Sequence, residues 1–358
     1  MVEQQTAEMV LAQTLSRIEG ADCRAFERAR AALDAKTKPR GSLGRLEKLA
    51  CRIVATRGDA AGSRLDAAVV VAAGDHGVAR EGVSAYAQEV TRQMLLNFAA
   101  GGAAICVLAR QADVRLVVVD AGAVEPVDHP SVRRLRIGPG TASIADGPAM
   151  SRDQALAALA AGIDLAGELA ADGIGAVCLG EMGIANTTAA SALSAALLPS
   201  DPAAVCGRGT GIDDDALRRK VEVVRRALEV NAPEPDDPVG CLAALGGFEI
   251  ALLAGVALGA AAEQLVVVLD GFIVGAAALV ACRLAPVLRE HLVASHLSAE
   301  PGHRLVLDEL GLRPLLDLDL RLGEGTGAVL AVPLLRASLA VLSEMATFGE
   351  AGVEDAGA

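Results

Sequence analysis

The stretch AAVVVAAGDHG, residues 67–77, holds seven apolar residues in a row before a glycine and two polar side chains. A short run rich in β-branched valine that ends in a glycine turn predicts a strand, here over residues 67–73. Because the run has no alternating polar positions, both faces of the strand should be covered by helices, as in a parallel sheet. The stretch therefore predicts an α/β fold.

Four further runs repeat this pattern between helical stretches. They are residues 116–119 before DAG, 175–179 before GEMG, 203–205 before CGRGTG and 265–269 before DGF. Alanine- and leucine-rich segments such as 151–171 and 212–231 separate them and predict helices. The expected fold is a Rossmann-like parallel sheet with helices on both faces.

The two ends of the chain have a different pattern from the middle. Residues 1 to about 60 and those from about 285 onward predict amphipathic helices punctuated by glycine loops. We therefore expect residues 61–290 to form a parallel α/β nucleotide-binding domain. Residues 1–60 with 291–358 are expected to form a smaller helical domain that includes the catalytic loop.

Composition excludes several classes of protein. The chain has 358 residues, of which 53% are hydrophobic and 22% charged, so it should fold around a core. A net charge of -13 and few aromatic residues argue against a nucleic-acid partner. The most apolar stretch, 250–282, is interrupted by Glu263, Gln264 and Asp270, so we expect no membrane insertion.

The start of the chain and its cysteines indicate a cytoplasmic protein. The first thirty residues carry charges at short intervals and no apolar block typical of a secretory signal. The seven cysteines are odd in number, widely spaced and without a CxxC pair, which favours reduced and mostly buried thiols.

Two glycine loops are candidates for binding an anion. In LGEMGIANTT, residues 179–188, Glu181 ends a predicted strand, and Gly183, Asn186 and Thr187 precede a predicted helix, whose first N–H groups can donate to a phosphate. The alternative for this loop is ordinary helix capping by Asn186 or Thr187.

The second loop is CGRGTG, residues 206–211, in which Gly207 and Gly209 allow close approach of the backbone to an anion. Lys220, about two turns into the following helix, could reach the same anion. The loop lacks the GxxxxGK[ST] spacing of a P-loop, and glycine turns at strand ends are common in themselves.

Two carboxylates stand out further along the chain. Asp270 directly follows the run 265–269, where it could accept hydrogen bonds from ribose hydroxyls or cap the next helix. Glu324 lies between two glycines in RLGEGTGA, residues 321–328, where loss of solvent would make a carboxylate more basic. The alternative is a loop carboxylate with no chemical role.

Histidines do not form a recognisable metal site. Asp75 and His76 follow the first strand, but the other histidines complete no HExxH or similar set, so structural hydrogen bonding is favoured and no metal is expected. Ser295 and His296, in the segment 291–303, should line the crevice or end a helix.

Taken in order, nine motifs resemble the nicotinate-nucleotide:dimethylbenzimidazole phosphoribosyltransferase family. They are TKPRGSLGRLE, GDHGV with EGVSAY and EVT, PAMS, GEMGIANTT, CGRGTG, LGGFEI, VVLDGF, SHLSAEPGH and LRLGEGTGA, and they span almost the whole chain. The resemblance implies transfer of the 5-phosphoribosyl group of nicotinate mononucleotide to 5,6-dimethylbenzimidazole. It implies no cofactor and no metal, and a homodimer.

The resemblance also implies roles for individual residues. Glu324 would be the general base that takes the benzimidazole proton. The phosphate would lie on Gly183, Asn186, Thr187, Gly207, Gly209 and Lys220, the ribose hydroxyls on Glu181 and Asp270, and the nucleotide against Ser295. The benzimidazole would occupy an apolar slot near Ser84, Tyr86, Met94 and Leu322.

Two departures from the family pattern bear on the choice of base. Tyr86 is followed by Ala87 where many members have proline, and Met94 stands where some have glutamine. Which lower-ligand base is preferred is therefore left open.

Two other functions are compatible with glycine loops at strand ends. A nucleotide-binding oxidoreductase would need GxGxxG with an acid about twenty residues later, which the chain lacks. A non-catalytic nucleotide carrier would not need Glu324 between its glycines.

Overall fold

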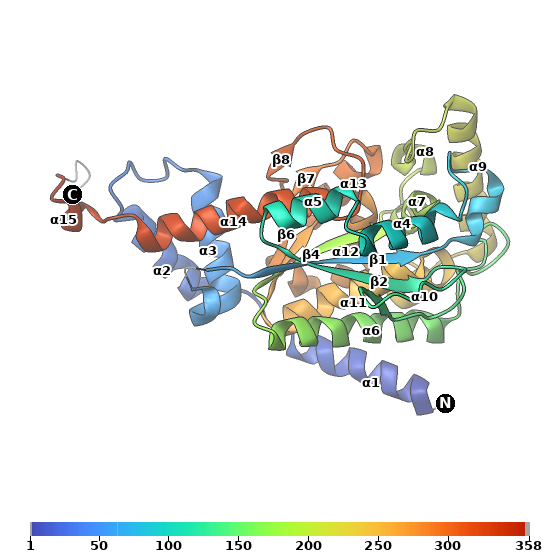
Figure 1. Cartoon of the computed structure of the whole chain (residues 1–358), viewed down its shortest axis with the longest axis horizontal. Helices are drawn as coiled ribbons and strands as arrows, with labels where there is room; N and C mark the ends of the chain where they lie inside the picture. Colours follow the sequence, from blue (N-terminus) through green and yellow to red (C-terminus); the bar gives the residue numbers. More distant parts are fainter. Residues whose placement is uncertain (1, 63, 355–358) are drawn as a thin grey trace.

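A six-stranded parallel sheet forms the centre of the computed structural model, which describes residues 2–62 and 64–354 (Figure 1). The strand order is β3-β2-β1-β4-β5-β6. The strands are β1 (Ala67–Gly74), β2 (Arg115–Gly122), β3 (Val132–Arg134), β4 (Ala176–Met182), β5 (Val266–Leu269) and β6 (Leu292–Ala294). This order is that of a Rossmann sheet, and it confirms the predicted fold class.

Alternate residues of each strand face two different cores. Val70 and Val177 pack with α6 (Arg152–Ala171), α11 (Phe248–Ala262) and α12 (Phe272–Leu284). Val69 and Cys178 pack with the helices of the other face, namely α3 (Arg45–Arg57), α4 (Val90–Ala99), α5 (Ala104–Gln111) and α14 (Thr326–Glu344). Helices on both faces explain why the strands contain almost no polar residues.

One predicted strand is wrong. Residues 203–205 lie in the short helix α8 (Pro202–Val205), because Asp201 caps it by accepting a hydrogen bond from the backbone N–H of Ala203. Proline at the first helical position also favours a helix here. The loop CGRGTG therefore follows a helix rather than a strand. It leads into α9 (Asp214–Asn231), which begins two residues later than predicted.

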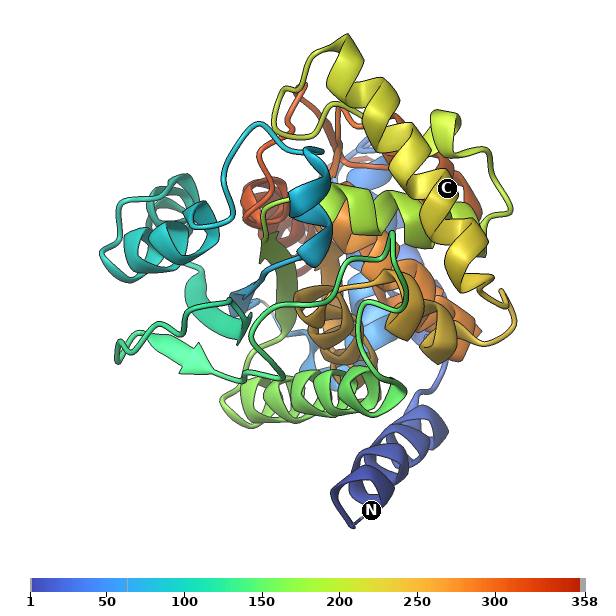
Figure 2. The same cartoon turned by 90° about the vertical axis from the view of Figure 1, so that its right-hand side faces the viewer.

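The remaining helices complete the two layers and the ends of the chain (Figures 1 and 2). They are α1 (Val2–Arg17), α2 (Cys23–Asp34), α7 (Asn186–Leu197), α10 (Pro238–Leu245), α13 (Pro301–Leu310) and α15 (Phe348–Ala351), with the 3-10 helices η1 (Gly58–Ala61), η2 (Gly77–Glu81) and η3 (Pro286–His291). A small second sheet pairs β7 (His296–Leu297) with β8 (Leu316–Asp317).

The N- and C-terminal segments meet beside the sheet. Helix α3 packs against α14, and Lys36 pairs with Thr347 in an isolated antiparallel bridge. Helix α1 instead packs on α6, as Figure 2 shows. Strand β6 also extends the main sheet beyond residue 290. The division into two domains stays a prediction.

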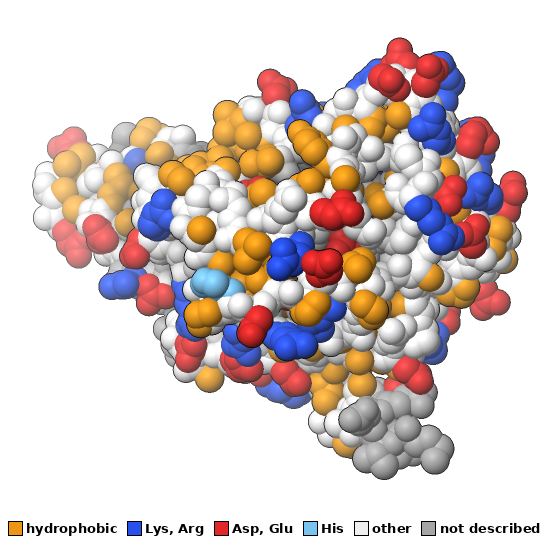
Figure 3. Space-filling model, turned by 45° about the vertical axis from the view of Figure 1, so that its right-hand side comes forward, with side chains coloured by type: hydrophobic (Ala, Val, Ile, Leu, Met, Phe, Trp, Pro, Cys, Tyr) orange, Lys and Arg blue, Asp and Glu red, His pale blue; other side chains and the backbone are white. Residues whose placement is uncertain are grey.

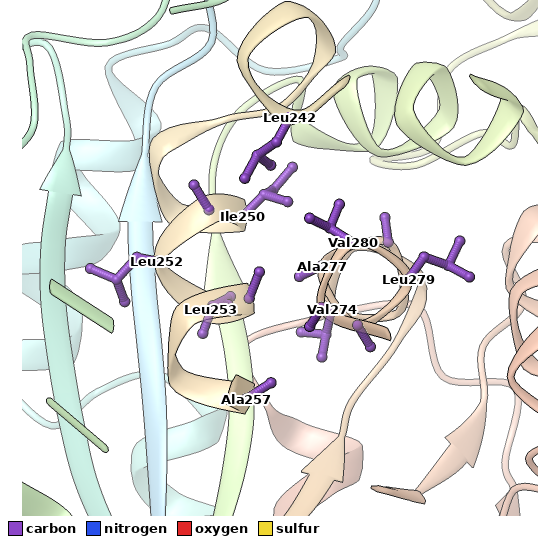
Figure 4. Packing of buried hydrophobic residues seen from close by; sticks show 14 of the residues in the cluster. Leu242, Ile250, Leu252, Leu253, Ala257, Val274, Ala277, Leu279 and Val280 are labelled. Atoms are coloured by element: carbon purple, nitrogen blue, oxygen red, sulfur yellow. The ribbon is translucent and has the colours of Figure 1, made fainter. Parts of the chain in front are cut away.

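Part of the core lies between α11 and α12, which are both buried and almost wholly apolar. Figure 4 shows Ile250 and Leu253 of α11 facing Val274 and Ala277 of α12. Small alanine side chains let the helices pack closely, and burial of this apolar area stabilises the fold. The N-terminus of α12 is thereby fixed at the carboxyl end of β5.

The surface charge bears on the expectation of no nucleic-acid partner, and the length of the helices bears on the expectation of no membrane insertion. Figure 3 shows basic and acidic side chains interspersed on this face rather than gathered by sign. By length and composition alone, three segments could cross a membrane, namely Val90–Gln111, Arg152–Ala171 and Thr326–Glu344. The last two are α6, which packs against α1, α10 and α11, and α14, which packs against α3, α5 and β4. The expectation of no membrane insertion stays a prediction.

Candidate active site

A cavity of about 570 Å³ lies at the carboxyl ends of β4 and β5. In a sheet of this order, ligands bind at that edge, near the point where the strand order reverses. The lining comes from six segments: Tyr86, Val90 and Met94; Glu181 to Thr187; Gly209 and Thr210; Gly271 to Val274; His296, Ser298 and Glu300; and Arg321 to Glu324.

Most of the predicted site residues line this one cavity. Those that do are Glu181, Gly183, Asn186, Thr187, Gly209, Tyr86, Met94, Leu322 and Glu324. Those that do not are Ser84, Gly207, Lys220, Asp270 and Ser295, each of which lies beside a lining residue. Loops more than a hundred residues apart in sequence therefore meet, as predicted.

Glu324 is held in a strained loop ahead of α14. Its φ is +62°, between Gly323 and Gly325, which also have positive φ, so three successive residues are left-handed. Only 5% of Glu324 is exposed, and burial raises the pKa of its carboxyl group, while the backbone N–H of Ile105, 3.4 Å from Oε2, acts against that rise. A carboxylate made more basic in this way suits a proton acceptor.

Asp270 holds this loop in place. Its Oδ1 accepts hydrogen bonds from the backbone N–H groups of Gly327 and Ala328 at 2.7 and 3.1 Å, and Oδ2 from that of Gly325 at 3.1 Å. Asp270 thus caps α14 rather than α12, and it does not line the cavity. Both oxygens accept backbone N–H groups, so Asp270 is not placed to accept hydrogen bonds from a ribose. This differs from the ribose-binding role that the sequence suggested for it.

Glu181 faces the cavity from the end of β4. Its Oε2 accepts a hydrogen bond from Asn186 Nδ2, and only 6% of the residue is exposed. Burial, with further contributions from Asp270, Glu249 and Glu324, raises the pKa of its carboxyl group to about 8, against the hydrogen bond from Asn186. Near neutral pH, Glu181 is therefore largely protonated and can donate as well as accept.

Lys220 links the two glycine loops by hydrogen bonds from a position outside the cavity lining. Its fully buried ammonium donates to Thr187 Oγ1 at 2.9 Å and to the carbonyl of Gly207 at 3.0 Å. Burial lowers the pKa of Lys220. The charge lies beneath the loop 183–187 rather than in the cavity itself.

The two loops differ in what their N–H groups do. The Gly209 N–H donates at 2.8 Å to Glu300 Oε1, so a carboxylate of the protein already occupies the second loop. In the first loop, the backbone N–H groups of Ala185 and Thr187 donate to none of the described residues. Both residues line the cavity at the N-terminus of α7, which has no side-chain cap. Of the two loops, the first is therefore the one whose N–H groups are left to bind an anion.

Three apolar side chains line the cavity together with Glu324. They are Tyr86, Met94 and Leu322, of which Tyr86 and Leu322 are each 57% exposed and so form its rim. Ser84 lies outside this lining, with its hydroxyl 3.4 Å from that of Thr210. The cavity thus offers a slot for a flat apolar ring beside a basic carboxylate.

Ser295 and His296 lie against the loop of Glu324. Ser295 is fully buried, and its hydroxyl lies 3.1 Å from His296 Nδ1. His296 lines the cavity, and burial lowers its pKa to about 4, so the imidazole is neutral near pH 7. Within residues 2–62 and 64–354, no three His, Cys, Asp or Glu side chains are grouped to hold a metal ion.

Comparison with known proteins assigns the family. A family model described as phosphoribosyltransferase matches residues 18–353. The nicotinate-nucleotide–dimethylbenzimidazole phosphoribosyltransferase of Chloroflexus aggregans is 52% identical over 347 residues, which are 97% of this chain and 98% of that relative. The enzyme of that name from Geobacter metallireducens is 50% identical over 350 residues, 96% of this chain and 98% of the relative.

The chain belongs to the nicotinate-nucleotide–dimethylbenzimidazole phosphoribosyltransferase family. A crystal structure of CobT from Thermus thermophilus has the same fold, with a TM-score of 0.88 and 53% identity over 92% of this chain and 99% of that one. The resemblance deduced from the nine motifs is thereby confirmed.

Several residues that line the cavity of this phosphoribosyltransferase were not predicted from the sequence. Glu300 and Ser298 follow β7, and Gly271 to Val274 form the start of α12. The motif SHLSAEPGH contains Ser298 and Glu300, but nothing in it indicates which way they face. The uncapped start of α12 could have been noticed, because an apolar helix begins directly after Gly271 without a serine, threonine or second acid.

Proposed function

We propose that the chain transfers the 5-phosphoribosyl group of nicotinate mononucleotide to 5,6-dimethylbenzimidazole, which gives α-ribazole 5′-phosphate and nicotinate for the lower ligand of cobalamin. One observation carries this proposal: Glu324, a buried basic carboxylate, lines the same cavity as the open N-terminus of α7. A phosphate and a weakly acidic N–H are what these two features recognise.

The nucleotide would be held by its phosphate. The free N–H groups of Ala185 and Thr187 donate to its oxygens, and the buried charge of Lys220 lies 2.9 Å from Thr187 Oγ1. Glu181, rather than Asp270, is the carboxyl group left to meet the ribose hydroxyls, because it lines the cavity and has an oxygen with no hydrogen bond among the described residues.

The reaction is a displacement at C1′. One ring nitrogen of the benzimidazole forms a bond to C1′, while the bond from C1′ to the pyridinium nitrogen breaks and its electron pair returns to the nicotinate ring. The proton on the other benzimidazole nitrogen passes to Glu324 as positive charge builds on the ring. The left-handed loop fixes the carboxylate for this transfer, and the capping by Asp270 fixes the loop.

Attack on the face opposite the leaving nicotinate inverts the anomeric carbon, which accounts for an α product. The apolar side chains of Tyr86, Met94 and Leu322 would hold the benzimidazole on that face. Ser84 would position Thr210, which lines the cavity and which it contacts. Gly207 would position Lys220 under the phosphate loop by accepting a hydrogen bond from its ammonium group. Ser295 would steady His296 beside the nucleotide.

We further propose that the protein works as a cytoplasmic homodimer, is not inserted in a membrane, and needs no metal or other cofactor. The free cysteines, of which all but Cys23 are buried, support the location, and the family resemblance supports the dimer. Light scattering coupled to gel filtration tests the dimer, and assay in the presence of a chelator tests the independence from metal.

The direct test of the activity is an incubation with nicotinate mononucleotide and 5,6-dimethylbenzimidazole. Chromatography should detect nicotinate and α-ribazole 5′-phosphate in equal amounts, and neither without the enzyme. Absence of both products in the complete mixture would refute the proposal. Replacement of the benzimidazole by other lower-ligand bases would measure the preference that Met94 and Ala87 leave open.

A further inference from the structure

The loop 183–187 is held from outside the cavity by one buried side chain, that of Thr91. The backbone N–H of Ile184 donates to Thr91 Oγ1 at 3.1 Å. Thr91 is fully buried and does not line the cavity, whereas Ile184 does. The next residue, Ala185, has a left-handed φ of +73°, and its N–H has no partner among the described residues. The bond to Thr91 therefore fixes the backbone directly ahead of an N–H group that is left to bind an anion.

The loop also lies directly against the end of β1. Ala73 of β1 pairs with Met182 of β4, the residue before the loop. A Cβ on Gly183 would lie 2.5 Å from the carbonyl oxygen of Gly74, so the two backbones are in contact and a larger residue would not fit. The residues that follow β1 are thereby placed beside the loop, and the first of them is Asp75.

Asp75 orients the hydroxyl group of Thr91. Only 3% of Asp75 is exposed, and its Oδ2 accepts a hydrogen bond from the N–H of Val124 at 2.7 Å. Burial raises the pKa of Asp75, and the Val124 N–H and the Thr91 hydroxyl act against that rise. A threonine whose hydroxyl hydrogen meets a carboxylate presents its oxygen to other donors, which here is the N–H of Ile184. Asp75 and Thr91 thus form a buried support for the loop.

We propose that Thr91, oriented by Asp75, is a positioning residue for the phosphate of the nucleotide. By holding the N–H of Ile184, it keeps the N–H groups of Ala185 and Thr187 in the arrangement that takes the phosphate oxygens. This role rests on the proposed function and extends it to side chains outside the cavity lining. The strength of a hydrogen bond depends on its direction, so loss of the support should weaken binding of the phosphate and leave the chemistry at C1′ unchanged.

Thr91→Val tests this role, because valine keeps the shape of threonine and removes only the hydroxyl group. Kinetics compare nicotinate mononucleotide with nicotinate riboside, which lacks the phosphate. We expect KM for the mononucleotide to rise by about tenfold at unchanged kcat, because the loop donors lose one of the bonds that align them. The kcat/KM for the riboside and the KM for the benzimidazole should not change, although Met94 of the same helix lines the cavity. Thr91→Ser, which keeps the hydroxyl, should retain the wild-type KM for the mononucleotide.

Thr56→Val is the matched control, since Thr56 is buried in α3 and lies outside the cavity lining. It makes the same exchange of a buried hydroxyl for a methyl group and should leave the ratio of the two substrates unchanged. Equal losses with the mononucleotide and the riboside in Thr91→Val, or no loss with either, would overturn the proposal. A loss of the same size in Thr91→Ser would assign the effect to packing and overturn it as well.

Calorimetry with the same two ligands measures this selectivity without turnover, so the proposed function can fail separately. If the wild type releases no nicotinate, the phosphoribosyl transfer is refuted, and binding still decides the role of Thr91. A Kd for the mononucleotide that rises by about tenfold in Thr91→Val, with an unchanged Kd for the riboside, would support the role. Equal changes for both ligands, or a change for neither, would reject it.

Discussion

The N-termini of α14 and α7 lie beside the same cavity but are completed in opposite ways. At α14, both oxygens of Asp270 take up backbone N–H groups, so the helix start is closed by the protein itself. At α7, the N–H groups of Ala185 and Thr187 are left without a partner among the described residues. The closed start fixes Glu324, the proposed general base, and the open start has N–H groups left to bind the substrate as proposed.

The largest effect should follow from removal of the carboxylate at the closed start. Glu324→Gln keeps the shape of the side chain but not its basicity, so turnover should fall by roughly 10² to 10⁴ while the nucleotide still binds. Steady-state kinetics and calorimetry measure the two quantities. Glu344→Gln, on the exposed end of the same helix, is the control and should keep full activity. Unchanged turnover in Glu324→Gln would exclude it as the base.

Opening the closed start should have the next largest effect. Asp270→Asn turns an NH₂ group toward N–H donors, so the loop of Glu324 should lose its fixed geometry and kcat should fall by roughly 100-fold. Thermal unfolding should show a loss of about 1–3 kcal/mol, since buried donors lose their acceptor. A variant with lower stability but normal kcat would mean that Asp270 acts on the fold alone.

These two residues also mark what could be deduced from the sequence. Glu324 could be singled out, because a carboxylate between glycines in a family motif is a local pattern. The capping by Asp270 could not, because its partners lie 55 to 58 residues further on, and local pattern offers only the next helix or a ligand. The same holds for Glu300, which occupies a glycine loop 91 residues earlier.

Secondary structure could likewise be predicted where the signal is local in the sequence. Long β-branched runs predicted β1, β2, β4 and β5, whereas β3 and β6 have three residues each and were missed. At 203–205, a capping aspartate and a proline outweighed the apolar pattern. Local signals thus identified the central strands, and contacts between distant segments decided the details of the site.

Weakening the open start should change nucleotide binding alone. Lys220→Met removes the ammonium beneath Thr187, and KM for the nucleotide should rise by roughly 10- to 100-fold because a charge-assisted contact is lost. KM for the benzimidazole should not change. Lys48→Met, an exposed residue of α3, serves as the control. An equal rise of both KM values would indicate a general loss of structure instead.

The last prediction concerns the pH dependence of stability, which should leave the chemistry of both helix starts unchanged. Burial raises the pKa of Glu181 from 4.5 to about 8, so the native state binds more protons than the unfolded chain between these values. The free energy of unfolding should therefore fall as pH rises through this range, by a few kcal/mol at most. Urea unfolding at several pH values measures the slope, and Glu181→Gln should flatten it. An identical slope in the variant would assign the effect to other groups.

The most direct test of the contrast between the two helix starts is a crystal structure with nicotinate mononucleotide bound. We predict phosphate oxygens about 3 Å from the backbone nitrogens of Ala185 and Thr187, with the bonds of Asp270 to α14 intact. A phosphate that displaces Glu300 from Gly209, or that binds at the start of α12, would contradict the account.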